Sequence, residues 1–267
     1  MEPIAALEQR ALAILSASGT ESVSVEFKQS WYEKTEGGRK ELAKDVTKFV
    51  DERWEDLTGG IRLNQNFSPN GLMMIVSPVF SESEGYRLNV PEWIKAAVPV
   101  RSPDGSDHSS GRPRIDGVLY RFSGDSAEDI GKYIKIYNNG VIETVECDVF
   151  NREEDRPIPG GSLMEILTFS AKQSIELSRR LTGATIYRVD LRMYANEGQQ
   201  IAFFRDTWSD SRGEVYNSDM SFDPTFVDLS LKEYEVEDFR PLLDQVWRSF
   251  GFVECGYFDG GTYAHPK

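Results

Sequence analysis

The sequence contains few residues of the kinds that form disulfide frameworks or bind zinc. Its 267 residues include two cysteines, Cys147 and Cys255, and two histidines, His108 and His265. The cysteines have neither CxxC spacing nor a histidine beside them, so we interpret both as structural thiols of a reducing compartment. Two histidines without cysteine partners cannot complete a zinc site. Disulfide scaffolds and zinc modules are therefore excluded.

Long apolar runs and nucleotide-binding motifs are also lacking. No uninterrupted apolar stretch approaches the roughly 20 residues of a membrane-spanning helix. The opening segment, MEPIAALEQR, has no basic residues ahead of its apolar ones, unlike a secretory signal. There is no G-x-S-x-G elbow and no P-loop, and the glycine pairs in EGG, TGG and PGG predict turns. We expect a cytoplasmic protein without membrane association.

Basic residues are also few relative to acidic ones. The chain has 30 Lys and Arg residues against 44 Asp and Glu residues, which gives a formal net charge of −14. Residues 1–150 and 151–267 each contribute −7 to that charge, so the average conceals no basic domain. Association with a polyanion normally needs a basic face. Binding of nucleic acid would therefore require a local patch.

Hydrophobic periodicity predicts a mixed α+β fold with a packed core. Helical spacing indicates helices over residues 3–18, 39–57, 91–98, 162–183 and 236–252. Alternation indicates strands over residues 22–29, 71–80 and 185–194, with 199–208 pairing beside the last of these. Asn138, Asn139 and Gly140 predict the turn of a hairpin over residues 132–150. Residues 116–124 are predicted to be ordered, whereas the composition of 101–114 predicts a loop.

The C-terminal half carries sharper local signals. Ser162 and Glu165 form a capping-box pattern, and Gly183 is a helix stop. The inner row of this helix is predicted to be Leu163, Leu167, Ala171 and Ile175. In the strand over residues 185–194 apolar and charged side chains alternate, which predicts a sheet covered on one side only. The polar segment 151–161, with two prolines and two glycines, is a linker candidate, so we predict domains over residues 1–150 and 160–267.

The segment ESVSVEFKQS carries the main candidate for chemistry. Glu26 and Lys28 share one face of the predicted strand, and Glu21 lies just before it. Two carboxylates could bind Mg²⁺ or Mn²⁺, and a lysine could orient water or neutralise a phosphate, as in a metal-dependent nuclease. The alternative interpretation is an ordinary strand with a charged outer face. Spacing alone leaves both open.

A column of lysines on the following helix could supply the local basic patch. Lys40, Lys44 and Lys48 recur every four residues and so lie on one face, with Arg39 beside the first. Such a column would guide a nucleic-acid backbone. The alternative is a solvated helix face, since five acidic residues lie on the same helix: Glu41, Asp45, Asp51, Glu52 and Glu55.

Taken together, these motifs resemble the AlbA-like domain of the Schlafen family over about residues 20–127. The Glu21–Ser22 and Glu26–Phe27–Lys28 segments match the opening of that domain, and Gly59–Gly60 matches its glycine pair. The segment RPRIDGVLYRFSGDSAED resembles its closing motif, through Pro113, Tyr120, Arg121, Gly124 and Ser126. Residues 160–267 are similar to C-terminal extensions of some bacterial members.

The resemblance implies a nucleic-acid-binding domain that in some members is a metal-dependent ribonuclease with two glutamates and an aspartate. It implies that Glu21 and Glu26 are the catalytic and metal-binding glutamates, with Lys28 beside them. It also implies that Arg121 contacts nucleic acid, either RNA or DNA, in a bacterial defence or regulatory role, and that a nuclease of this kind would cleave RNA rather than DNA. The aspartate has no counterpart here, because the strand over residues 71–80 runs into Ser81 and Glu82.

The alternative hypothesis is a catalytically silent protein-protein interaction module that retains the AlbA-like scaffold. Its motivation is the acidic surface, the incomplete set of acids and the large aromatic residues of the second half, Trp208, Trp247 and Phe250. Large aromatics often anchor protein interfaces.

Overall fold

The computed structural model describes residues 47–52, 70–79, 89–96, 98–105, 108–122, 132–147, 158–195, 203–204, 220–259 and 262–263. Two compact units divide the chain, residues 1–52 and residues 53–267. In the first unit residues 47–52 form a helix in which Phe49 and Val50 are buried, in agreement with the helix predicted over 39–57. The predicted helix over 3–18 and the strand over 22–29 lie outside the described residues.

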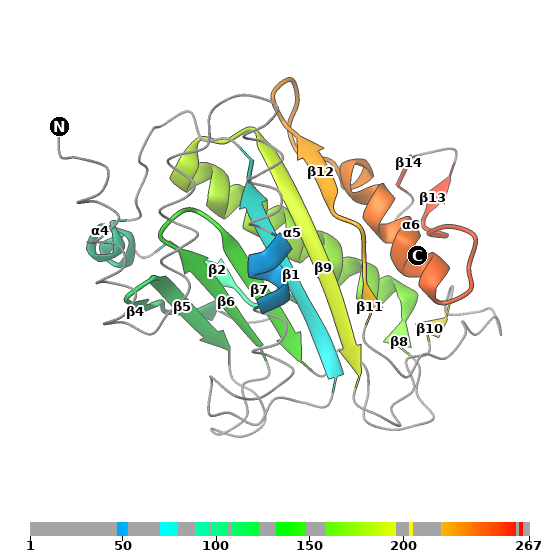
Figure 1. Cartoon of the computed structure of the whole chain (residues 1–267), viewed down its shortest axis with the longest axis horizontal. Coiled ribbons are helices and arrows are strands. Elements are labelled where there is room, and N and C mark those ends of the chain that lie inside the picture. Colours follow the sequence, from blue (N-terminus) through cyan, green and yellow to red (C-terminus); the bar gives the residue numbers. More distant parts are fainter. Residues whose placement is uncertain are drawn as a thin grey trace. The chain divides into compact units, whose positions relative to one another are not determined.

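The second unit is built on an antiparallel sheet to which eight of the described strands belong (Figure 1). The order is β11-β9-β1-β7-β6-β5-β4, and β12 also pairs with β9. Together with the helices on one of its faces, this sheet confirms the α+β class. The strands are β1 (Asn70–Pro78), β4 (Arg112–Arg114), β5 (Gly117–Phe122), β6 (Lys132–Tyr137), β7 (Ile142–Cys147), β9 (Ile186–Ala195), β11 (Met220–Ser221) and β12 (Thr225–Asp228).

Both halves of the chain contribute strands to this sheet. β1 lies between β7 and β9 and pairs with β9 along its whole length, from Asn70 opposite Ala195 to Pro78 opposite Tyr187. Strands β1 to β7 precede the predicted linker over residues 151–161 in the chain, whereas β9, β11 and β12 follow it. The two predicted domains therefore share one sheet.

The hairpin of β6 and β7 forms where its turn residues predict it. Gly140 has φ +81°, a conformation that glycine adopts without strain. The Asn139 side-chain oxygen accepts from the Val141 N–H at 3.1 Å, and the Tyr137 N–H donates to the Val141 carbonyl at 2.9 Å. These bonds fix the register in which Ile136 faces Ile142.

Helix α5 (Gly160–Thr182) packs on one face of the sheet against β1 and β7, and runs behind the strands in Figure 1. All four residues of its predicted inner row are buried in one core cluster with Leu72, Met74 and Val76 of β1. Gly183 has φ +65° and its N–H donates to the Arg179 carbonyl, so the predicted stop is confirmed. The predicted start is wrong, because the helix begins at Gly160 and exposed Ser162 lies inside it.

The helix predicted over residues 236–252 is a 3₁₀ turn, η1 (Val236–Phe239), that leads into α6 (Arg240–Ser249). Pro241 lies in the first turn of α6, where its missing N–H has no helical partner to lose. The predicted apolar stripe is confirmed, since all its members are buried in the cluster that contains the α5 row: Phe239, Leu242, Leu243, Val246 and Phe250.

Several short elements complete the described part of the unit. The predicted helix over 91–98 is α4 (Val90–Lys95), with Pro91 in its first turn. The predicted loop over 101–114 instead contains parts of β2 (Val100–Arg101), β3 (His108–Ser109) and β4, because backbone pairs of two or three residues can form without a periodic side-chain pattern. A C-terminal hairpin joins β13 (Phe258–Asp259) to β14 (Thr262–Tyr263).

One predicted strand pairing is wrong where the structure describes it. The sequence predicts residues 199–208 beside the strand over 185–194, whereas the two described residues of this range, β10 (Phe203–Phe204), pair in parallel with β8 (Ile158–Pro159). Among the described residues, the partners of β9 are β1, β11 and β12. No described helix is long and apolar enough to cross a membrane.

Candidate functional site

The face of the sheet opposite α5 carries most of its ionisable side chains, and we call it the polar face. Its register places Asp190, Ile75, Glu143, Lys135, Leu119 and Arg112 in one row across the strands. Because side chains alternate along each strand, the neighbours two residues away share this face. Its ionisable residues on β4 to β9 include Arg112, Arg114, Arg121, Lys135, Glu143, Arg188, Asp190 and Arg192.

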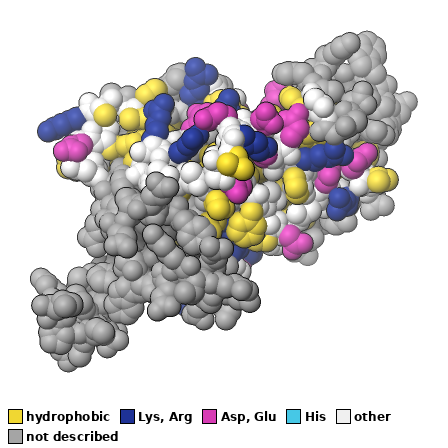
Figure 2. All heavy atoms as spheres, turned by 90° about the horizontal axis from the view of Figure 1, so that it is seen from above, with side chains coloured by type: hydrophobic (Ala, Val, Ile, Leu, Met, Phe, Trp, Pro, Cys, Tyr) yellow, Lys and Arg dark blue, Asp and Glu magenta, His cyan; other side chains and the backbone are white. Residues whose placement is uncertain are grey.

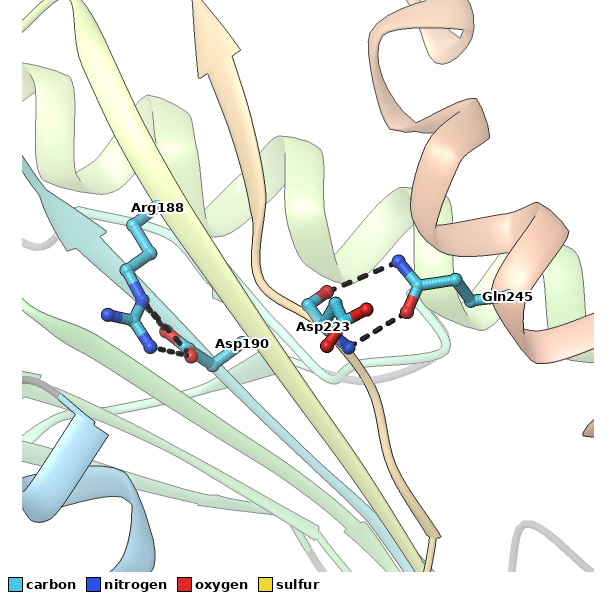
Figure 3. A network of polar contacts seen from close by, with 4 residues as sticks. All are labelled: Arg188, Asp190, Asp223 and Gln245. Atoms are coloured by element: carbon cyan, nitrogen blue, oxygen red, sulfur yellow. Dashed lines mark hydrogen bonds and ion pairs between the residues drawn. The ribbon is translucent and has the colours of Figure 1, made fainter. Parts of the chain in front are cut away.

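A buried ion pair lies on β9 at one side of the polar face. Arg188 Nε donates to both carboxylate oxygens of Asp190, at 3.1 and 2.9 Å, and Nη2 donates to Oδ1 at 2.6 Å (Figure 3). Burial raises the pKa of Asp190, and the hydrogen bonds and charge of Arg188 oppose that rise. Both side chains are buried, so the prediction of a sheet covered on one side only is wrong.

The centre of the polar face holds a second buried carboxylate. Glu143 is fully buried, and the hydroxyls of Tyr133 and Tyr137 donate to its two oxygens, Tyr137 at 2.6 Å. Next to it, Lys135 binds Asp116 at 2.6 Å and lies 4.3 Å from the centre of the Tyr137 ring. Charges in the middle of the sheet are therefore engaged by neighbours within the fold.

Three arginines at the β4 side of the sheet differ from this pattern, and we call them the arginine edge: Arg112, Arg114 and Arg121. β4 is the last of the described strands at this side of the sheet, with Arg112 opposite Leu119 and Arg114 opposite Gly117 of β5. This register puts Arg121, two residues beyond Leu119, on the same face. Arg112 and Arg114 are exposed, and none of the three is ion-paired with a carboxylate among the described residues.

Arg121 is the innermost member of the arginine edge. Its Nε is buried and has no hydrogen-bond partner in the described part of the chain. Burial lowers the pKa of Arg121, and the positive charges of Arg114 and Arg112 lower it further. Both burial and the neighbouring positive charges disfavour the charged form of Arg121. An anion placed among the three side chains would therefore stabilise the charged guanidinium.

The backbone beneath the arginine edge is held firmly. Gly117 has φ +151°, and a Cβ there would lie 1.9 Å from the Ile136 carbonyl oxygen on β6. On the opposite face the Trp93 indole N–H donates to the Tyr120 hydroxyl at 2.7 Å, which ties α4 to β5. Pro113 lies in the middle of β4, at the sheet edge where proline is tolerated.

Of the residues predicted from sequence, Arg121 lies at this site and Tyr120 and Pro113 support it. Arg112 and Arg114 were missed, although their i, i+2 spacing would put both on one face of a strand, because residues 101–114 were interpreted as a loop. Gly124 and Ser126 lie outside the described residues.

The other predicted site residues belong to the first unit. Glu21, Glu26, Lys28, Lys40 and Lys44 lie outside the described residues, and their roles stay predictions. Lys48 is described: its side chain is 75% exposed and pairs with Glu52 at 3.2 Å. Among the described residues, no group of three or more His, Cys, Asp or Glu side chains could hold a metal ion.

The aromatic anchors of the interaction-module hypothesis need correction. Trp247 and Phe250 are fully buried in the core under α6, so they present no surface to a partner. Trp208 lies outside the described residues. The described surface seen in Figure 2 carries acidic and basic side chains intermixed with hydrophobic ones.

Comparison of the chain with protein-family models, with curated proteins and with solved structures found no match.

Proposed function

We propose that the chain binds nucleic acid, and that the arginine edge contacts the phosphate backbone. The observation that carries the proposal is the set of three guanidinium groups on one face, unpaired with acids in the described part of an otherwise acidic protein. It also agrees with the resemblance of residues 20–127 to the AlbA-like domain of the Schlafen family, in which Arg121 lies in the closing motif.

The chemistry of arginine supports a phosphate ligand. A guanidinium presents five N–H donors in a planar fork that matches two oxygens of a phosphate, and it keeps its charge at all ordinary pH values. Arg112 and Arg114 reach solvent from the last strand, so a long polymer can approach them from the side. Arg121 lies one strand further in and would contact a phosphate lying between the two strands.

We further propose that the first unit supplies metal-dependent cleavage. Support for this part comes from sequence alone, since Glu21 and Glu26 match the glutamates of the family motif and Lys28 lies two residues after Glu26. The two carboxylates would bind Mg²⁺ or Mn²⁺ through oxygen, which both ions prefer. RNA is the expected substrate.

The binding proposal is tested with the full chain and labelled single-stranded RNA and DNA at low salt, where backbone contacts are strongest. The combined variant Arg112→Gln, Arg114→Gln and Arg121→Gln is expected to bind at least about tenfold more weakly, since each charge-assisted hydrogen bond contributes about 1.5–3 kcal/mol. Arg180→Gln, an exposed arginine on α5, is the matched control and should bind like wild type. Equal binding by all three proteins would contradict the proposal.

Cleavage is tested separately by incubating the same substrates with Mn²⁺. Glu26→Ala is expected to abolish any cleavage while leaving binding at the arginine edge unchanged. If the wild-type protein binds these substrates but cleaves none of them, the cleavage proposal is wrong and only the binding proposal stands.

A further inference from the structure

We infer that the arginine edge recognises phosphate groups alone, so that its ligand is bound without regard to base sequence or sugar. The inference rests on the proposed function and specifies what that site reads. It follows from the donors that the edge offers and from the aromatic rings and amides of the described strands and turns beside it, which are buried or hydrogen-bonded within the fold.

The edge offers donors suited to phosphate. Arg112 and Arg114 alternate with Pro113 on a three-residue strand, so their guanidinium groups lie on the same face at successive outward positions. The Nε of Arg121 is buried and has no hydrogen-bond partner among the described residues. The rest of the Arg121 side chain is partly exposed, and its charge is disfavoured by burial and by Arg114 and Arg112, so an anionic acceptor beside it would offset these costs.

Among the described residues, the aromatic rings on the strands beside the edge are not exposed for stacking. Proteins that grip bases of single strands do so by stacking them on exposed aromatic rings. Here Phe122 of β5 is 3% exposed, and the tyrosines of β5 and β6, Tyr120, Tyr133 and Tyr137, are at most 4% exposed. Their hydroxyls are also engaged, with Trp93 for Tyr120 and with Glu143 for the other two.

In the described turns beside the edge, two side-chain amides each make a hydrogen bond within the fold. Asn138 donates through Nδ2 to the Ile115 carbonyl at 3.2 Å, and Asn139 accepts from the Val141 N–H at 3.1 Å. Both bonds are internal to the two turns beside the edge. The side chain that projects most from the β4–β5 turn is Ile115, which is 81% exposed and has no hydrogen-bonding group.

The salt dependence of binding gives the expected size of the effect. On single strands each neutralised phosphate contributes about 0.7 to the slope of log affinity against log salt. Three contacts would therefore weaken binding about 20-fold between about 50 and 200 mM salt. Arg121→Gln should lower the slope by about 0.7, and the combined arginine variant should lower it by about 2.

The experiment measures binding of poly-dT, poly-dA and poly-U of equal length by fluorescence anisotropy, in a salt titration and with linear inorganic polyphosphate as competitor. Polyphosphate carries the phosphates without base or sugar. Wild type, Arg121→Gln, the combined arginine variant and the Arg180→Gln control are compared, with circular dichroism as the check on folding.

Affinities within about threefold for the three polymers, with competition by polyphosphate and the stated slopes, would support the inference. A preference above about tenfold for one polymer, or no competition by polyphosphate, would overturn it while nucleic-acid binding stood. Binding of polyphosphate but of no nucleic acid, lost in the combined variant, would support the phosphate site and overturn the proposed function. If the protein binds neither polyphosphate nor nucleic acid, both the inference and the proposed function are overturned.

Discussion

At the scale of single residues, Gly117 shows how backbone conformation and close packing can require one residue type. It opens β5 directly under the arginine edge, opposite Arg114 on one side and Tyr137 on the other. Its φ of +151° is outside the range that other L-residues favour, and the Ile136 carbonyl oxygen occupies the place of a Cβ. Two independent causes therefore require glycine here.

Gly117→Ala is expected to lower the free energy of unfolding by about 3 kcal/mol or more, because strain at φ and overpacking against backbone add together. Gly183→Ala is the matched control, since Gly183 has φ +65° but nothing lies within 4 Å of the added Cβ. That change should cost only about 1 kcal/mol. Urea unfolding of both variants measures the difference, and equal losses would show that the clash with Ile136 is relaxed at little cost.

Arg188 and Asp190 mark the limit of residue-level prediction. Their two-residue spacing on a strand correctly places them on one face, away from Tyr187 and Val189. An alternating charged face normally indicates solvent, whereas here the two charges engage each other and are buried. Spacing reveals the shared face, but burial depends on what else lies over that face, which local sequence does not contain.

At the scale of elements, two glutamines fasten helices to the chain beside the sheet. Gln245 of α6 accepts from the Asp223 N–H at 2.8 Å and donates to the Asp223 carbonyl at 3.3 Å (Figure 3). Gln173 of α5 makes the same pair of bonds with the backbone of Arg101, both at 2.9 Å. Each amide thus satisfies both backbone groups of one residue.

Gln245→Ala is expected to destabilise the protein by about 1 kcal/mol, because the two Asp223 backbone groups exchange a fixed partner for water. Lys172→Ala, at an exposed position of α5, is the control and should stay within about 0.5 kcal/mol of wild type. Urea unfolding gives the free energies, and hydrogen exchange at Asp223 should be faster in the glutamine variant. Unchanged exchange at Asp223 would mean that the bonds do not hold this segment.

Helices and hairpins could be predicted where the pattern that indicates them lies within one continuous stretch of sequence. The apolar row of α5 and the stripe of α6 repeat at helical spacing, and the Asn139–Gly140 turn joins two alternating runs. The pairing of β1 with β9 was not predictable, because about a hundred residues separate Ile75 from Asp190 in the sequence. The arginine edge was found only in part for a related reason, since β4 is three residues long and its pattern is too short to show a period.

At the scale of the whole molecule, the second unit holds several weakly acidic side chains in their neutral form, and burial opposes their ionisation. Burial raises the pKa of Tyr187 to about 12 and that of Cys255 to about 12. It also raises the pKa values of Tyr120, Tyr234 and Tyr263. In the unfolded chain these groups would lose their protons near their ordinary values, about pH 8.5 for a thiol and 10 for a phenol.

This arrangement predicts that the protein loses stability in alkali. Above pH 9 the unfolded state binds fewer protons than the folded state, so the free energy of unfolding must fall as pH rises. For Tyr187 the loss extends from about pH 10, the ordinary phenol pKa, to about pH 12, and amounts to roughly 2 kcal/mol. Tyr187→Phe should therefore unfold with a shallower decline in that window. Its cost at neutral pH should be about 1 kcal/mol, from the lost 2.5 Å bond to the Ala184 carbonyl.

Urea unfolding at pH values from 7 to about 12 compares the two proteins. Their curves should run parallel below about pH 9, approach each other above about pH 10 and cross before about pH 11, so that Tyr187→Phe is the more stable protein by roughly 1 kcal/mol at about pH 12. Curves that stay parallel throughout would show that the Tyr187 phenol does not contribute to the alkaline loss.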